Sequence, residues 1–238
     1  MKKNILKILG IFILGVFGGI FADQILWPYL IERPLFYQYR LEQSPVYVTE
    51  TKEITVEENV ALQGAIEKVD KIVVGVRAEK KSGEVLEGSG FIATSDGLVV
   101  TLNNLLPQGS EFSFFVDGKT VAYQILKRDP DNNLALIKLE KNNLPTLAFA
   151  DFDRVKLGER VFLLGIIFQA DNIKKMTNEG IIRGFDENFI ETNIFDSIDL
   201  KGSPLFNISG EILGINTVNL AGKVISIPVS KIKQFINI

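Results

Sequence analysis

The sequence contains no histidine and no cysteine among its 238 residues. Without histidine, the chain has no imidazole to act as a general base or as a metal ligand near neutral pH. Without cysteine, it has neither a disulfide nor a thiolate site. Its formal net charge of −3 gives no basis for binding nucleic acid. We therefore expect no cofactor, no metal and no nucleic-acid partner.

The N-terminal residues have the pattern of a membrane segment. Lys2, Lys3 and Lys7 precede an uncharged apolar run at 8–22. Continued to residue 31, this run would form a helix of about 36 Å, enough for a hydrocarbon core of about 30 Å. The lysines favour a cytoplasmic N-terminus and an extracytoplasmic body, on the cell surface or the periplasmic side. We interpret residues 1–31 as a cytoplasmic stub and a single-pass signal-anchor helix.

A cleaved signal peptide is the alternative, because the same lysines also suit the charged region of such a peptide. The expected small residue is missing from the nearest cleavage site, since Ile20 precedes Phe21 and Ala22. This favours the uncleaved anchor. Gly15 and Gly19 form a GxxxG pattern that leaves a homo-oligomer open as a further alternative.

Two segments connect this helix to the body. Residues 32–55 mix prolines, aromatics and charges without a helical stripe, which is typical of a linker or stalk. Residues 56–71 carry apolar side chains at helical spacing, with acidic residues early and lysines late. This arrangement favours an amphipathic lead-in helix.

The first half of the body contains ordered turn and strand signals. We interpret Gly88-Ser89-Gly90 as a turn that opens a strand, and Asp96-Gly97 and Asp117-Gly118 as hairpin turns. A strand at 98–101 leads into a polar pair that ends at Asn104. Further along, Asp129 and Pro130 precede Asn133 and an apolar run at 134–137.

The second half is organised around residues 190–217, IETNIFDSIDLKGSPLFNISGEILGINT. A short strand is followed by a loop with Gly202-Ser203-Pro204, a turn at 207–210, and a strand that ends at Thr217. Before it come a turn and strand at 149–165 and a strand at 178–182, and after it a strand at 225–229.

Taken in order and spacing, these motifs resemble the HtrA (DegP-like) branch of the trypsin-like serine proteases, over about 60–235. The resemblance implies an all-β fold of two six-stranded antiparallel β-barrels within residues 56–238. The first barrel would span about 72–145, the second about 146–229, and a C-terminal helix 230–238. The family's PDZ module would begin where this sequence ends, so we expect none within it.

The same resemblance places Asn104, Asn133 and Lys201 where the family has its catalytic histidine, aspartate and serine. An amide has no usable basicity near neutral pH. In a working triad, the change from aspartate to asparagine alone lowers the rate by about four decades. Asp199 stands at a family glycine beside the oxyanion site, where a carboxylate opposes the charge to be stabilised. We therefore expect a degenerate, catalytically inactive site.

Three further interpretations of the loop residues are weighed. Lys201 would serve as a base for Ser203 only if it were desolvated and held in hydrogen-bond geometry. Asp199 and Lys201 would alternatively fill the former site with an internal ion pair. The acids of the other loops are interpreted as turn residues rather than as metal ligands: Asp129, Asp131, Asp151 and Asp153.

The function that we expect is binding. Trypsin-like proteases hold substrates as an added β-strand, and the corresponding segment would be Gly214, Ile215, Asn216, Thr217 and Val218. The expected partner is a polypeptide or protein, which makes the chain a regulator or scaffold of an extracytoplasmic protease or envelope complex, or a holdase. Two alternatives stay open, an active serine endopeptidase and a structural spacer domain.

Overall fold

The computed structural model describes residues 2–32, 60–169 and 172–237. The chain divides into two units, Met1–Val56 and Glu57–Ile238. The predicted linker at 32–55, apart from residue 32, and the first four residues of the predicted lead-in helix lie outside the described residues. Those two predictions are therefore left open for these positions.

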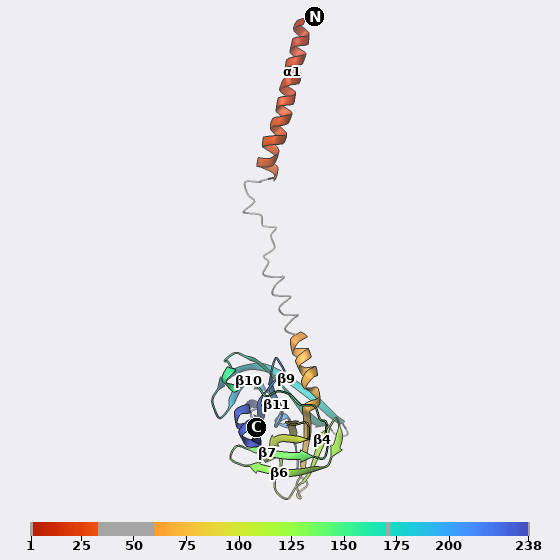
Figure 1. Ribbon diagram of the computed structural model, residues 1–238, viewed down its shortest axis with the longest axis vertical. Helices are drawn as coiled ribbons and strands as arrows, with labels where there is room; N and C mark the ends of the chain where they lie inside the picture. Colours follow the sequence, from red (N-terminus) through yellow and green to blue (C-terminus); the bar gives the residue numbers. More distant parts are fainter. Residues whose placement is uncertain (1, 33–59, 170–171, 238) are drawn as a thin grey trace. The chain divides into compact units, whose positions relative to one another are not determined.

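Residues 2–32, the described part of the N-terminal unit, are helical. Helix α1 (Lys2–Phe21) continues as a π-helical segment, η1 (Ala22–Glu32). Figure 1 shows α1 in red. Within these elements, Lys7–Trp27 is long and apolar enough to cross a membrane by length and composition. Its 21 residues would span about 32 Å at α-helical rise, so this segment is a candidate membrane span.

The second unit begins with a helix at 60–69, followed by the short 3-10 segment η3 (Asp70–Ile72). A seven-stranded antiparallel sheet follows, in the order β5-β4-β1-β2-β3-β7-β6. A 3-10 turn, η4 (Asn103–Leu105), follows β3. The strands are β1 (Val73–Glu79), β2 (Val85–Ile92), β3 (Leu98–Leu102), β4 (Glu111–Val116), β5 (Lys119–Val121), β6 (Tyr123–Asp129) and β7 (Leu134–Leu139).

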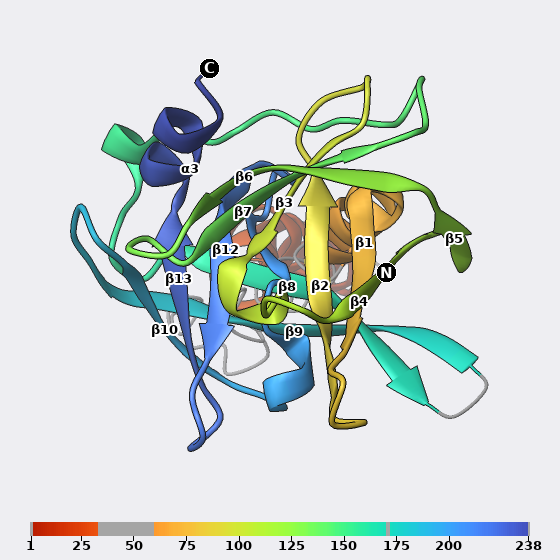
Figure 2. The same ribbon diagram turned by 90° about the horizontal axis from the view of Figure 1, so that it is seen from below.

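The rest of this unit is a closed barrel in the order β10-β13-β12-β11-β8-β9, followed by helix α3 (Val229–Ile236). Two 3-10 turns lie in its loops, η5 (Phe152–Arg154) and η6 (Ile198–Leu200). Figure 2 shows α3 near the end of β13. The strands are β8 (Arg160–Gln169), β9 (Asn172–Phe185), β10 (Ile190–Phe195), β11 (Pro204–Asn207), β12 (Ile212–Val218) and β13 (Lys223–Pro228).

The predicted all-β trypsin-like fold is confirmed, and its second barrel closes with six strands. The first half differs in detail, because it has seven strands whose order ends at β5 and β6 instead of closing. Strand β5 ends at Val121 and β6 begins at Tyr123, so a single residue connects the two edge strands. The C-terminal helix lies within two residues of its predicted bounds.

Strand β8 shows why the two halves pack together. Its residues 161–166 are all buried, although they belong to one antiparallel strand. Val161 and Leu163 face the smaller core cluster of the closed barrel, whereas Phe162 and Leu164 belong to the cluster that extends into the first sheet. Since alternate side chains point to opposite faces, this strand has no polar face and reads as a continuous apolar run. It therefore forms the seam between the halves.

The hairpin turn predicted at Asp117-Gly118 is confirmed, whereas the turn predicted at Gly88-Ser89-Gly90 is wrong. Asp117 and Gly118 both have positive φ, 51° and 73°, as a two-residue hairpin turn of type I′ requires. Gly88 and Gly90 lie inside β2, so they do not open the strand. Their role is close approach, because a Cβ on Gly88 would lie 2.6 Å from the Lys201 carbonyl oxygen.

Candidate functional site

The loop before β11 is a tight 3-10 turn. Ser197 caps η6, since its Oγ accepts a hydrogen bond from the Asp199 N–H at 3.3 Å. The Leu200 N–H donates to the Ser197 carbonyl at 3.1 Å and continues the turn. Gly202 then adopts a φ of +80°, the left-handed region that a glycine enters without strain. The chain can therefore reverse direction immediately after Lys201.

Main-chain hydrogen bonds anchor this turn to both halves of the domain. The Ser89 N–H, on β2, donates to the Lys201 carbonyl at 2.9 Å. The Gly202 N–H donates to the Asn216 carbonyl at 2.7 Å, and the Asn216 N–H donates to the Ser203 carbonyl at 2.8 Å. A Cβ on Gly202 would lie only 2.1 Å from the Ser89 carbonyl oxygen. The position of residue 201 is thus fixed by backbone contacts that exclude other side chains at residue 202.

A buried polar chain lies behind the turn. Ser203, Asn216 and Ser226 are all fully buried. The Asn216 amide nitrogen donates to Ser203 Oγ at 3.0 Å, and its amide oxygen accepts from the Ser226 hydroxyl. In the described part of the chain, Ser203 has no hydrogen bond with Lys201. The geometry of a serine–lysine dyad is therefore not formed, and Ser203 packs as a structural residue.

Asn104 and Asn133, which sequence reasoning placed at two reactive positions, are neighbours. Asn133 adopts a left-handed conformation with a φ of 53°, and its Oδ1 accepts from the Asn104 backbone N–H at 2.9 Å. Its main-chain carbonyl accepts from the Asn103 N–H at 3.1 Å. Asn104 is exposed and Asn133 half-buried. Because both side chains are amides, the pair has no group that ionises near neutral pH.

Lys201, the third predicted position, lies in a turn that packs against the segment with Asn104. Leu105 follows Asn104 and is fully buried. A Cβ on Gly88 would lie 2.7 Å from Leu105 Cδ1, and a Cβ on Gly202 would lie 3.0 Å from the same atom. The segment with Asn104 therefore packs directly against the turn that carries Lys201. The structure brings the three predicted positions to one place.

The two backbone N–H groups that an oxyanion site would use are both taken within the turn. The Asp199 N–H donates to Ser197 Oγ, and the Lys201 N–H donates to the Ile198 carbonyl at 3.2 Å. An oxyanion site requires donors that point at the place where negative charge develops. In this conformation neither N–H group is available for that purpose.

Charged side chains lie near the turn without forming the Asp199–Lys201 ion pair that was weighed as one interpretation. Asp199 accepts from the Ser197 hydroxyl at 3.0 Å, and among the described residues no ion pair joins Asp199 to Lys201. Within the first sheet, Arg77 Nε of β1 lies 3.7 Å from Glu87 Oε1 of β2. Burial raises the pKa of the Glu87 carboxyl, Arg77 opposes that shift, and the Asp199 charge adds to it. The carboxylates of Glu87 and Asp199, one from each half, are therefore close enough for their charges to interact.

The predicted peptide-binding segment is only partly free. Gly214 pairs with Leu205 of β11, and Ile215 with Pro204. Asn216 exchanges main-chain hydrogen bonds with the turn, as described above. For Thr217 and Val218, the described residues provide a partner strand only on the β13 side. The edge that remains for an added strand is therefore shorter than the five predicted residues.

Ser89 is the site residue that sequence reasoning missed. It is fully buried within β2, and its Oγ accepts from the Ile166 N–H on β8 at 2.8 Å. Its carbonyl accepts from Thr101 Oγ1 at 2.7 Å. The residue thus joins the two halves and holds the Lys201 carbonyl. A polar residue between two glycines in a buried strand was the available signal.

The predicted turn acids behave as turn residues. Asp129 accepts from the Asn132 N–H and side-chain amide at 3.0 and 2.8 Å, and these hydrogen bonds lower the pKa of its carboxyl. Asp151 accepts from the Asp153 N–H at 3.3 Å. Within the described ranges, no group of three or more acidic side chains is arranged to hold a metal ion.

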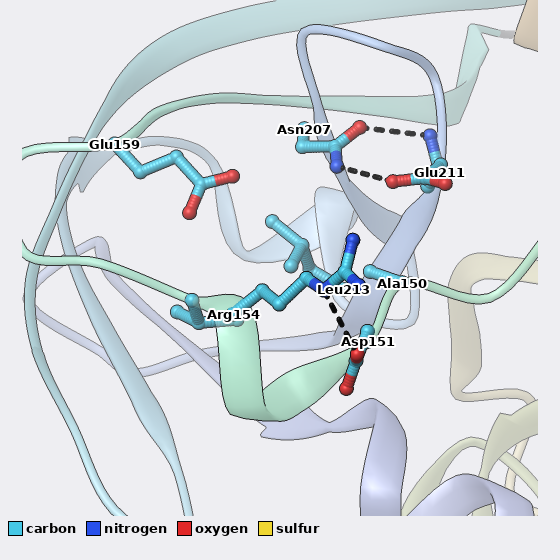
Figure 3. Close-up of a pocket in the computed structure, with 8 residues that line it drawn as sticks. Ala150, Asp151, Arg154, Glu159, Asn207, Glu211 and Leu213 are labelled. Carbon is cyan, nitrogen blue, oxygen red and sulfur yellow. Dashed lines mark hydrogen bonds and ion pairs between the residues drawn. The ribbon is translucent and has the colours of Figure 1, made fainter.

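A pocket of about 110 Å³ lies on the closed barrel, and none of the predicted site residues lines it. Figure 3 shows Arg154 paired with Asp151, and Asn207 paired with Glu211. Glu159 faces the same space from a separate loop. The acids here are held mostly by their neighbours, and the arrangement indicates no particular chemistry.

Comparisons with known proteins agree with this geometry. Residues 88–215 match the trypsin-like peptidase domain family, which is more than half of the chain. A probable periplasmic serine endoprotease DegP-like from Chlamydia pneumoniae is 29% identical over 156 residues, 61% of this chain and 31% of the relative. The protein with the same description from Pseudomonas putida (strain W619) is 32% identical over 139 residues, 55% of this chain and 28% of the relative.

The chain therefore spans less than a third of the length of these curated relatives. The matched region contains β2, the Asn104 and Asn133 segments, and the turn with Lys201. It also contains the β11–β12 pairing that supports the turn. The chain has a closed six-stranded barrel, with glycines where β2 and the turn approach each other closely. It belongs to the trypsin-like peptidase domain family, and its curated relatives are DegP-like.

Proposed function

We propose that this protein is a catalytically inactive, HtrA-like pseudoprotease that binds polypeptide on the extracytoplasmic side of a membrane. The observation that carries the proposal is the set of residues at the three reactive positions, Asn104, Asn133 and Lys201, in a chain without histidine. None of the three supplies a general base paired to a serine nucleophile. The engaged N–H groups of Asp199 and Lys201 add support.

Binding survives because it uses main-chain groups. Asn216 directs its N–H and carbonyl to the turn, and alternate residues of a strand direct these groups to the same edge. The main chain of Val218 therefore points to the open edge beside the turn. An extended polypeptide added there would gain backbone hydrogen bonds without the reactive side chains. The role that follows is regulator, scaffold or holdase, with a polypeptide or another protein as partner.

Membrane anchoring is part of the same proposal. The candidate span at Lys7–Trp27 is preceded by lysines at positions 2, 3 and 7, which favour a cytoplasmic N-terminus. Two DegP-like relatives are described as periplasmic. Both observations support a globular domain on the extracytoplasmic side.

The test uses the full-length protein in detergent micelles with fluorescein-labelled, unfolded casein. We expect fluorescence anisotropy to rise on binding, with no release of labelled fragments. Val218→Pro removes the edge N–H and should weaken binding about five- to tenfold, whereas Val218→Ile keeps that N–H and should bind normally. Equal binding by both variants would contradict the strand-addition mechanism.

The two alternatives give different results in the same assay. An active endopeptidase would release casein fragments at a rate abolished by Ser203→Ala. A spacer domain would neither bind nor cleave casein. Either result would overturn the proposed function.

A further inference from the structure

A second pocket, of about 480 Å³, opens on the first half between the β1–β2 turn and the loop before β4. None of the residues predicted from the sequence to form a site lines it. Its walls come from two chain segments that lie far apart in sequence but side by side in the sheet. The lining residues are Glu79, Lys80, Lys81, Gly83, Gly109, Ser110 and Glu111.

Two carboxylates face each other at this pocket. Glu79 of β1 is in register with Glu111 of β4. Directly opposite side chains have Cβ atoms about 4.5–5.5 Å apart, and like charges there repel. Neither carboxylate forms an ion pair with another described residue. Among the described residues, no ion pair therefore neutralises either carboxylate.

The remaining charges leave the pocket acidic. Lys80 is neutralised by Glu84, with Nζ and Oε1 2.9 Å apart. Lys81 is then the single unpaired ammonium against the two carboxylates of Glu79 and Glu111, within the part of the chain that the structure describes. A cationic group fits this balance, and an anionic group does not.

Ser110 supplies an independent observation. Its hydroxyl oxygen is the one buried side-chain polar atom without a hydrogen-bond partner among the described residues, and its accessible area is below 1 Å². Buried polar atoms are nearly always partnered. Because Ser110 lines the pocket, rotation about its Cα–Cβ bond would direct the hydroxyl to a ligand there. A ligand that donates an N–H group would satisfy it.

One residue of the pocket shares a strand face with a charged pair that lies nearer the turn with Lys201. Glu79 lies two residues beyond Arg77 on the same face of β1, about 7 Å along the strand. Arg77 pairs with Glu87, and the charge of Asp199 in the turn contributes to the raised pKa of the Glu87 carboxyl. One face of the β1–β2 pair therefore carries Glu79, Arg77 and Glu87, from the pocket toward the turn.

We propose that this pocket binds a basic side chain, preferentially an arginine, of a bound polypeptide. A guanidinium group carries five N–H donors in a planar fork, enough to reach both carboxylates and the Ser110 hydroxyl together. The polypeptide part of the proposal rests on the proposed function above. The affinity of the pocket for a guanidinium group does not depend on that proposed function.

The test titrates the full-length, ¹⁵N-labelled protein in micelles with N-acetyl-arginine amide and with its neutral isostere, N-acetyl-citrulline amide. We expect the arginine compound to bind about tenfold more tightly and to shift the amide resonances of Glu79, Ser110 and Glu111. Glu79→Gln and Glu111→Gln should each remove most of this preference. Glu140→Gln, an exposed glutamate of the same half, is the matched control and should leave the preference unchanged.

Equal binding of the two compounds, or an unchanged preference in the double variant of Glu79 and Glu111, would overturn the pocket assignment. A melting temperature measured for each variant separates loss of binding from loss of folding. If the arginine compound binds but unfolded casein does not, the pocket stands and the proposed function fails. If casein binds while the two compounds are not distinguished, the proposed function stands and the pocket assignment fails.

Discussion

The turn that carries Lys201 and the side chains at two of the three predicted positions, Asn104 and Lys201, show opposite degrees of constraint. Three backbone hydrogen bonds tie the turn to Ser89 and Asn216, and the space beside Gly202 admits no side chain. By contrast, Asn104 is exposed, and Lys201 is half-buried without an ion pair in the described structure. The framework that positions residue 201 is therefore independent of the chemistry at that residue.

This independence has a physical reason. The turn is held by main-chain groups and by the buried amide of Asn216, none of which would change if residue 201 were serine. Hydrogen bonds between backbone groups do not depend on the side chains attached to them. A protein of this fold can therefore exchange its reactive residues and keep the strand edge beside them.

The largest predicted effect comes from Gly202→Ala. The added Cβ would meet the Ser89 carbonyl oxygen at 2.1 Å, and the φ of +80° would strain any other residue. We expect a loss of about 3–5 kcal/mol in the free energy of unfolding, measured by urea denaturation with circular dichroism. Gly83→Ala is the matched control, because Gly83 has a φ of +84° with nothing within 4 Å. It should lose only about 1–2 kcal/mol, and equal losses would contradict tight packing of the turn.

A smaller loss is expected for Asn216→Ala. Its side chain connects the hydroxyls of Ser203 and Ser226 in a fully buried site. Truncation leaves both hydroxyls without this partner, so unfolding should become easier by about 2–3 kcal/mol in the same denaturation assay. Asn142→Ala, at an exposed loop residue, should change stability by less than about 0.5 kcal/mol. A neutral result for Asn216→Ala would remove the buried amide from the account of the framework.

The smallest predicted effect concerns Glu87, a charged side chain near the turn. Burial raises the pKa of Glu87 above 4.5, so folding favours its protonated form. That contribution is present below the unfolded pKa and is lost as the pH rises through the folded pKa. Glu87→Gln stays neutral, so its melting temperature should gain on the wild type between about pH 4 and pH 7. A gain by the wild type over the same interval would mean that Arg77 outweighs burial.

Much of the fold was predictable because local chemistry decides it. Asp117-Gly118 predicts a hairpin on its own, since both residues tolerate positive φ, and the structure confirms it. Gly202 and the residues around it were enough to identify, from the sequence, the segment that forms the turn with Lys201. The Gly88-Ser89-Gly90 motif was misread, because glycines that allow close approach look the same in sequence as glycines that form turns.

The site was less predictable where distant segments meet. The hydrogen bond between Ser89 Oγ and the Ile166 N–H joins residues 77 positions apart. The Gly88-Ser89-Gly90 pattern draws attention to Ser89, but no local pattern identifies Ile166 as its partner. The sequence left open whether Asp199 and Lys201 pair, and they do not, because in the 3-10 turn the Ser197 hydroxyl donates to Asp199. Opposite charges two residues apart do not make an ion pair when a nearer hydroxyl and the turn geometry compete.

Labelling with a serine-directed fluorophosphonate tests most directly the proposal that this framework persists in a catalytically inactive chain. The full-length protein in micelles would be incubated with the probe beside active trypsin, and any adduct located by mass spectrometry. We predict no adduct on the wild type, because Ser203 is buried against Asn216 and no histidine exists to activate a serine. A stoichiometric adduct that disappears in Ser203→Ala would contradict that prediction and identify an active serine peptidase.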